Sequence, residues 1–214
     1  MEKPAADLHR FLEPFSRQWH KGSMNEEPLV TALKNQDTGA VQELVNAYGD
    51  RLLRSAFFLC GNETEAQDIL QDTFLEAIRS IHRFQGRSSI YTWLHAILLN
   101  LTRRYHRDHK RIIYDDELAD REISSPDGSP SPLDSVTASS AISKALRQLS
   151  GTHREVIVLR YYEDMKIHEI ASHLGISKGT VKSRLHYAIG EMQKLLPDEL
   201  NLFGACGTEE MQKQ

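Results

Sequence analysis

Residues 167–187 read IHEIASHLGISKGTVKSRLHY and carry the clearest structural signal in the chain. Ile170 and Leu174 are apolar at a spacing that places them on one face of a helix. Gly175 follows where the chain must turn, and glycine adopts positive φ without steric cost. Ser177 is a favourable N-cap for a second helix. The stretch therefore predicts two helices joined by a tight turn, a helix-turn-helix.

The second of these helices combines an apolar face with a basic one. Apolar residues recur at helical spacing and predict its buried side, which consists of Val181, Leu185, Ala188, Ile189, Met192 and Leu196. Between them lie basic and hydroxyl side chains, namely Lys178, Thr180, Lys182, Ser183, Arg184 and His186. The sequence has no acidic residue from Ser177 to Gly190. Such an outer face suits the major groove of DNA, and the alternative is a helical hairpin whose basic face is only solvated.

Composition and charge limit the class of protein. The chain has 214 residues, of which 40% are hydrophobic and 26% charged, as in a soluble globular protein of one large or two small domains. Its formal net charge is −4, so DNA binding requires basic residues clustered on part of the surface. The two cysteines, Cys60 and Cys206, lack the spacing of a zinc site. No apolar run reaches transmembrane length and the N-terminus lacks a signal-peptide core, so we expect a cytoplasmic protein without membrane insertion.

Residues 25–111 predict a series of helices. Asp37 can cap one helix, and Gly49 and Gly61 are candidate breaks around an apolar stretch. Asn62, with a glutamate three residues later, resembles a capping arrangement at the start of the next helix. The apolar residues that follow have helical spacing: Ala66, Ile69, Leu70, Phe74, Ala77, Ile78 and Ile81.

Residues 84–88 read FQGRS and predict a loop before a long helix. Ser88 or Ser89 is the candidate cap, and one side of the helix carries Ile90, Trp93, Leu94, Ile97, Leu98, Leu101 and Tyr105. Residues 103–111 contain five Lys or Arg residues against one aspartate, as expected of a stripe that binds phosphates. Trp93 on this apolar side is expected in the core.

No segment shows the alternation of a strand, so the predicted fold is all-α, with two small helical domains joined by a flexible acidic linker. The expected divisions are an N-terminal extension (1–24), a first domain (25–111), the linker (112–132), a second domain with the helix-turn-helix (133–197) and a tail (198–214). In the second domain, Pro132 suits a helix start and Thr152 with Glu155 is a candidate capping pair.

The N-terminal extension allows three interpretations. Its apolar residues share one helical face, namely Leu8, Phe11, Leu12, Phe15 and Trp19. This face can dock a partner or pack on the rest of the chain, or Met24 can be the true start.

Two sets of motifs resemble one protein family. The stretches EVIVLRYY (155–162), LGIS (174–177) and GTVKSRLH (179–186) are similar to region 4 of the extracytoplasmic-function sigma factors of bacterial RNA polymerase. The stretches AQDILQDTF (66–74), FQGRSS (84–89) and YTWL (91–94) are similar to region 2 of the same family. Both sets occur in the family's order on either side of the linker. The resemblance implies a protein that directs promoter-specific initiation and catalyses nothing itself.

The resemblance also implies a role for each surface. The face that docks on the β′ clamp of core polymerase corresponds to Asp68, Gln71 and Asp72, which otherwise form a solvated helix face. The part that melts and captures the −10 element corresponds to Phe84, Gln85, Gly86, Arg87, Ser88, Ser89 and Asn100, with phosphate contacts from Arg103, Arg104, Arg107 and Lys110. The −35 element corresponds to Lys178, Thr180, Lys182, Ser183, Arg184, His186 and Tyr187.

As partners the resemblance implies the β′ clamp and β flap of core polymerase, promoter DNA and an anti-sigma factor. It implies no small-molecule substrate, cofactor, metal or catalytic residue. Two rival functions follow from parts of the sequence: a stand-alone helix-turn-helix regulator with residues 25–111 as a sensor or dimerisation domain, and a helical enzyme with some of the ten histidines, such as His106 and His109, at a metal. Neither rival accounts for both sets of motifs.

Overall fold

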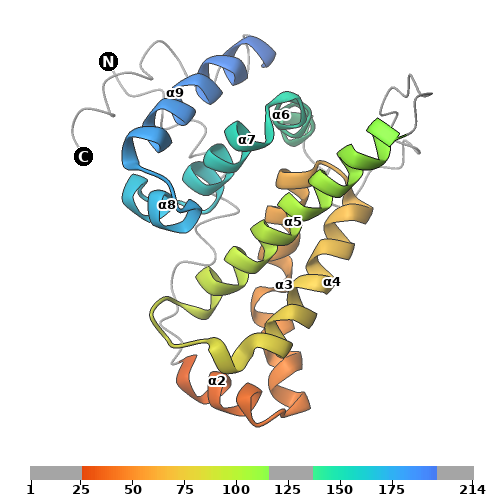
Figure 1. The fold of residues 1–214 in the computed structure, drawn as a ribbon, viewed down its shortest axis with the longest axis vertical. Helices are drawn as coiled ribbons and strands as arrows, with labels where there is room; N and C mark the ends of the chain where they lie inside the picture. Colours follow the sequence, from red (N-terminus) through yellow and green to blue (C-terminus); the bar gives the residue numbers. More distant parts are fainter. Residues whose placement is uncertain (1–25, 116–136, 197–214) are drawn as a thin grey trace. The chain divides into compact units, whose positions relative to one another are not determined.

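The structure is a computed structural model that describes residues 26–115 and 137–196. Within these residues every regular element is helical, which confirms the all-α prediction (Figure 1). The helices fall into two compact units, one formed by α2 to α5 and the other by α6 to α9. None of the described helices is long and apolar enough to cross a membrane.

The first unit is built on three long helices. They are α3 (Thr38–Cys60), α4 (Glu63–Ser80) and α5 (Ile90–Asp115), and each packs on the other two (Figure 1). The short helix α2 (Glu26–Lys34) contacts α3 and the 3-10 turn Ile81–Arg83. The centre of the unit is apolar, with Leu44, Leu52, Ile90, Leu94, Leu98 and Leu99 fully buried. Burial of these side chains supplies most of the stability of such a unit.

Most helix ends in this unit follow the predicted signals. The Asp37 side chain accepts a hydrogen bond from the Gly39 N–H at 2.7 Å and caps α3. Gly61 ends α3 in the left-handed conformation, with φ 80°, and Asn62 caps α4. Of the two serines, Ser89 caps α5, because its hydroxyl accepts a hydrogen bond from the Thr92 N–H at 3.1 Å.

Two predictions in this unit were wrong. Gly49 does not break the chain, since α3 continues through it and the residue is buried within the helix. The long helix extends to Asp115, four residues into the predicted linker, since residues 112–115 contain no proline or glycine that would end it.

The second unit contains α6 (Thr137–Gln148), α7 (Gly151–Ile157), a π-helical segment (Val158–Tyr162), α8 (Ile167–Leu174) and α9 (Lys178–Leu195). Helix α9 packs on α6, α7 and α8. Its predicted apolar face is confirmed, because Val181, Leu185, Ala188, Ile189, Met192 and Leu196 are all buried. The helix ends two residues before Pro197, as proline predicts.

The predicted capping pair of α7 was wrong. Ser150 rather than Thr152 is the N-cap, and its side chain accepts a hydrogen bond from the His153 N–H. Glu155, the other member of the predicted pair, is buried within the helix. The extension 1–24, the linker from residue 116, Pro132 and the tail lie outside the described residues.

Candidate functional site

The helix-turn-helix is held by contacts between near neighbours in the sequence. Gly175 ends α8 with φ 67°, and its N–H donates to the carbonyls of Ala171 and Ser172. The Ile176 N–H donates to the Ala171 carbonyl at 3.0 Å, which closes the turn. Ser177 then caps α9 by accepting a hydrogen bond from the Thr180 N–H at 3.0 Å. The turn therefore fixes the direction of α9 through local geometry.

The outer face of α9 presents the side chains predicted for the −35 element. Lys178, Ser183, His186 and Tyr187 are exposed, and Thr180, Lys182 and Arg184 are half-buried. Two hydroxyls are already engaged, since Thr180 hydrogen bonds to the Ser177 hydroxyl and Ser183 donates to the Thr180 carbonyl. The face also carries lysine, arginine and histidine nitrogen groups, which suit base edges and phosphates.

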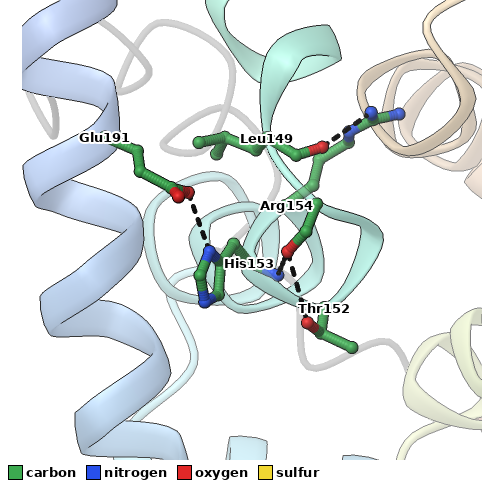
Figure 2. A network of polar contacts seen from close by, with 6 residues as sticks. Leu149, Thr152, His153, Arg154 and Glu191 are labelled. Carbon is green, nitrogen blue, oxygen red and sulfur yellow. Dashed lines mark hydrogen bonds and ion pairs between the residues drawn. The ribbon is translucent and has the colours of Figure 1, made fainter.

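Figure 2 shows polar contacts between α7 and α9 that the sequence did not predict, with His153 pointing toward Glu191. The ring of His153 on α7 stacks on Tyr187, with centroids 6.4 Å apart and planes 17° apart. His153 Nδ1 also lies 2.8 Å from the Glu191 carboxylate, one turn further along α9. Tyr187 itself is 64% exposed. The network thus ties the outer face of α9, which carries the exposed Tyr187 ring, to α7.

Helix α5 presents a second accessible stripe. Asn100, Arg104 and Arg107 are exposed and Arg103 is half-buried, so these predicted DNA contacts share one side of the helix. Lys110 lies on α5 beyond the side chains that the structure describes. The stripe has the amide and guanidinium groups that read base edges and bind phosphates.

Loop 84–89 precedes this stripe, and its first residue is buried while the other five are exposed. Gln85 to Ser89 are exposed, and Gly86 has φ 68°. The Phe84 side chain is buried and packs on Trp93, with ring centroids 5.2 Å apart. The Phe84 ring is therefore part of the core, and the backbone of Phe84 begins the loop. Trp93, which was expected in the core, is only half-buried.

Helix α2 holds both ends of loop 84–89, and sequence reasoning missed this. Lys34 Nζ donates to the Phe84 carbonyl at 3.2 Å, and the Glu26 carboxylate accepts from the Ile90 N–H at 2.8 Å. Tyr48 donates to the other oxygen of Glu26 at 3.3 Å. Burial, followed by the negative charge of Glu26, raises the pKa of Tyr48 to about 12.

The acidic face of α4 is solvent-accessible. Asp68, Gln71 and Asp72 are all exposed. Beside them Leu75 is 43% exposed and Ile78 is 36% exposed, and both are large apolar side chains. Tyr105 on α5 forms a hydrogen bond to Glu65 on α4, which joins the two helices. Burial, followed by the charge of Glu65 and this hydrogen bond, raises the pKa of Tyr105. An acidic face with exposed apolar side chains suits a protein partner with basic groups.

No group of three or more His, Cys, Asp or Glu side chains among the described residues is arranged to hold a metal ion. The predicted site residues instead fall on three helical faces, on α4, on loop 84–89 with α5, and on α9. The structure brings together the members of each face within one unit.

Comparisons with known proteins match both parts of the chain. A family model described as Sigma-70 region 2 matches residues 44–112, and one described as Sigma-70, region 4 matches residues 145–194. The chain is 30% identical to the ECF RNA polymerase sigma factor SigW of Bacillus subtilis over 79% of this chain and 95% of that protein. It is 32% identical to the ECF RNA polymerase sigma factor SigL of Mycobacterium tuberculosis over 79% and 96%.

A solved structure gives the same result. The sigma factor RpoE of Bartonella quintana, in complex with the anti-sigma factor NepR, is 27% identical, with a TM-score of 0.62 over 72% of this chain and 94% of that one. Helix α2 lies before the residues that the region 2 family model matches, so its contacts to loop 84–89 were not to be found from that match. Sigma-70 proteins are non-catalytic transcription initiation factors. On both family models and on these relatives, the chain belongs to the extracytoplasmic-function sigma factors of the sigma-70 family.

Proposed function

We propose that this sigma factor divides its work among the three faces described above. The α4 face with Asp68, Gln71 and Asp72 binds the β′ clamp of core polymerase. Loop 84–89 and the α5 stripe capture and hold the melted −10 strand. The outer face of α9 binds the −35 element, and the second unit also meets the β flap. The observation that carries this proposal is the separation of an acidic, partly apolar face from two faces rich in basic and amide groups.

Charge supports the proposal that DNA is read only in the complex with polymerase. The net charge of the chain is −4, although residues 177–190 contain no acidic side chain. Because the salt-dependent part of DNA affinity follows from phosphate neutralisation, we expect the free chain to bind promoters weakly. A protein that works with polymerase on DNA is expected in the cytoplasm.

An anti-sigma factor is the proposed regulator. The support is the similarity to the Bartonella quintana sigma factor, whose structure contains the anti-sigma factor NepR. A protein that covers the α4 face would block the proposed polymerase contact. Competition between such a protein and core polymerase for the full chain measures this directly.

Transcription in vitro tests the proposed function. The full chain is added to core polymerase of the source bacterium with a library of its genomic promoters, and new transcript starts are sequenced. We expect initiation at a defined set of promoters that share −35 and −10 elements. Absence of any such set contradicts the proposal, and a promoter footprint by the chain without polymerase would identify a stand-alone regulator instead.

Two substitutions test the division of work. Asp72→Ala removes an exposed carboxylate of the α4 face and is expected to weaken polymerase binding, while Lys182→Ala is expected to weaken use of the −35 element. Each loss is expected to reach about tenfold, as for one charged contact in an interface. Asp50→Ala on α3 and Lys194→Ala at the end of α9 are matched controls, because both are exposed charges outside the proposed faces. Loss of the same step in both test variants contradicts the assigned roles.

A further inference from the structure

Loop 84–89 is bounded by two long-range hydrogen bonds from one short helix. Lys34, at the end of α2, contacts the carbonyl at the start of the loop at 3.2 Å, across 50 residues of sequence. Glu26, at the beginning of α2, contacts the N–H of Ile90 at 2.8 Å, across 64 residues. Between these anchors the loop residues 85–89 are exposed. The two ends of one helix therefore hold the two ends of one loop.

The Glu26 contact is chemically suited to this place. Ile90 is the first residue of α5, where a backbone N–H has no partner within the helix and the helix dipole favours a negative charge. Ser89 already caps the N–H of Thr92, so the Glu26 carboxylate satisfies a different N–H of the same helix end. Hydrogen bonds with an ionised acceptor are stronger than neutral ones.

Further contacts fix the Glu26 carboxylate itself. Tyr48 on α3 donates to its second oxygen, and the Tyr48 ring packs near that of Tyr91, with centroids 5.9 Å apart. The Arg51 guanidinium lies 3.8 Å from the centre of the Tyr91 ring. The first turn of α5 is thus held from α2 and α3 together. The arrangement leaves the loop backbone little freedom at its second end.

We infer that α2 sets the shape of loop 84–89 for capture of the −10 strand, with Glu26 and Lys34 as positioning residues that do not touch the DNA. This inference rests on the proposed function, because it takes the loop as the part that binds the melted strand. A loop held in its binding shape loses less conformational entropy when the strand binds. Releasing either end therefore lowers affinity for the single strand without removing any group that contacts it.

The test uses the full chain bound to core polymerase and a fork-shaped DNA. The DNA is double-stranded through the −35 element and carries a single non-template strand at −10, both taken from the promoter that wild-type holoenzyme uses most. Glu26→Ala and Lys34→Met are each expected to lower affinity for this DNA about tenfold, as when one charge-assisted hydrogen bond is lost. Glu26→Gln and Lys34→Arg keep an acceptor and a donor, and are expected to stay within about twofold of wild type.

Two further measurements separate positioning from general damage. Affinity for core polymerase and for a duplex that contains only the −35 element is expected to stay at the wild-type level in all four variants. Hydrogen exchange at the Ile90 amide is expected to accelerate in Glu26→Ala and to stay slow in the control Asp50→Ala, an exposed acidic residue of α3. If Glu26→Ala fails to fold, Lys34→Met, which removes only one hydrogen bond at the other end, decides the question.

Two results would overturn the inference. One is wild-type affinity for the fork DNA in Lys34→Met, or in a folded Glu26→Ala whose Ile90 amide exchanges fast. The other is an equal loss of polymerase, duplex and fork binding, which indicates a structural role alone. Failure of the proposed function looks different, because wild-type holoenzyme itself then shows no preference for the fork DNA over an unrelated sequence.

Discussion

The turn before α9 and loop 84–89 before α5 are built from the same parts but held in different ways. Each contains a glycine with positive φ, Gly175 at 67° and Gly86 at 68°, and each ends in a serine that caps the following helix. The first is closed by hydrogen bonds that span at most five residues. The second is anchored by bonds that span 50 and 64 residues. A local turn carries its shape in its own sequence, whereas the loop takes its shape from α2.

The largest expected effect tests whether the two units, one with loop 84–89 and one with the turn before α9, are stabilised separately. Leu98→Ala in α5 and Met192→Ala in α9 each truncate a fully buried side chain, and each is expected to cost about 2–5 kcal/mol of unfolding free energy. Because each side chain packs within its own unit, hydrogen exchange should accelerate only in α2 to α5 for the first and only in α6 to α9 for the second.

Conservative replacements provide the control for this pair. Leu98→Met and Met192→Leu nearly keep the side-chain volume and are expected to cost less than about 1.5 kcal/mol. Faster exchange in both units after either truncation would show that the two units do not unfold separately.

The next effect compares the two glycines directly. A Cβ at either position meets no atom within 4 Å, so the cost of alanine is the backbone conformation alone. Gly175→Ala is expected to cost about 1–2 kcal/mol, because the hydrogen bonds of the turn allow no other conformation. Gly86→Ala is expected to cost less in stability, since its exposed neighbours can adjust, and to lower −10 strand affinity instead. Thermal unfolding and fork-DNA binding measure the two quantities.

Asparagine at the same positions sharpens this comparison. Asn tolerates positive φ better than alanine, so Gly175→Asn should recover part of the lost stability and Gly86→Asn part of the lost affinity. Equal stability losses for both alanine variants would mean that the loop is as rigid as the turn.

The same difference explains what the sequence predicted and what it did not. The turn, its caps and the buried face of α9 were predicted because each depends on residues within one or two turns of helix. The N-cap of α7 was predicted two positions too late, because Thr152 with a glutamate three residues later matches the capping-box pattern. The pattern did not show that Ser150 forms the capping hydrogen bond instead.

Helix α2 and its contacts were missed for a different reason. Its local signals were present, with two glutamates in the first turn, Pro28, and Leu29 and Leu33 one turn apart. They predict a short helix but not its target, because pairing Glu26 with Ile90 needs the tertiary fold. For the same reason the sequence did not show that the Phe84 ring turns inward onto Trp93.

The caps provide a smaller test of the same contrast. Ser177→Ala removes the side-chain cap of α9 and is expected to cost about 1 kcal/mol. Ser89→Ala is expected to cost about half as much, because Glu26 still binds the first N–H of α5 and favours the helix dipole. Chemical denaturation of each variant gives the two free energies. In a Glu26→Ala background the cost of Ser89→Ala should rise toward that of Ser177→Ala, and an unchanged cost would show that the two caps act independently.

The smallest expected effect concerns a contact between α9 and a residue distant in sequence. His153 and Glu191 are separated by 38 residues and lie 2.8 Å apart, with the Glu191 side chain about half exposed (Figure 2). Solvent screens such a pair, so a double-mutant cycle with His153→Ala and Glu191→Gln is expected to give a coupling of about 0.2–1 kcal/mol. Since Tyr187 also stacks on His153, the His153→Ala variant should reduce −35 binding slightly more than Glu191→Gln does. A different result would be a loss of −35 binding in both variants as large as the loss of −10 binding in Glu26→Ala. The α9 face would then depend on distant contacts as much as loop 84–89 does, and the contrast between the two regions would fail.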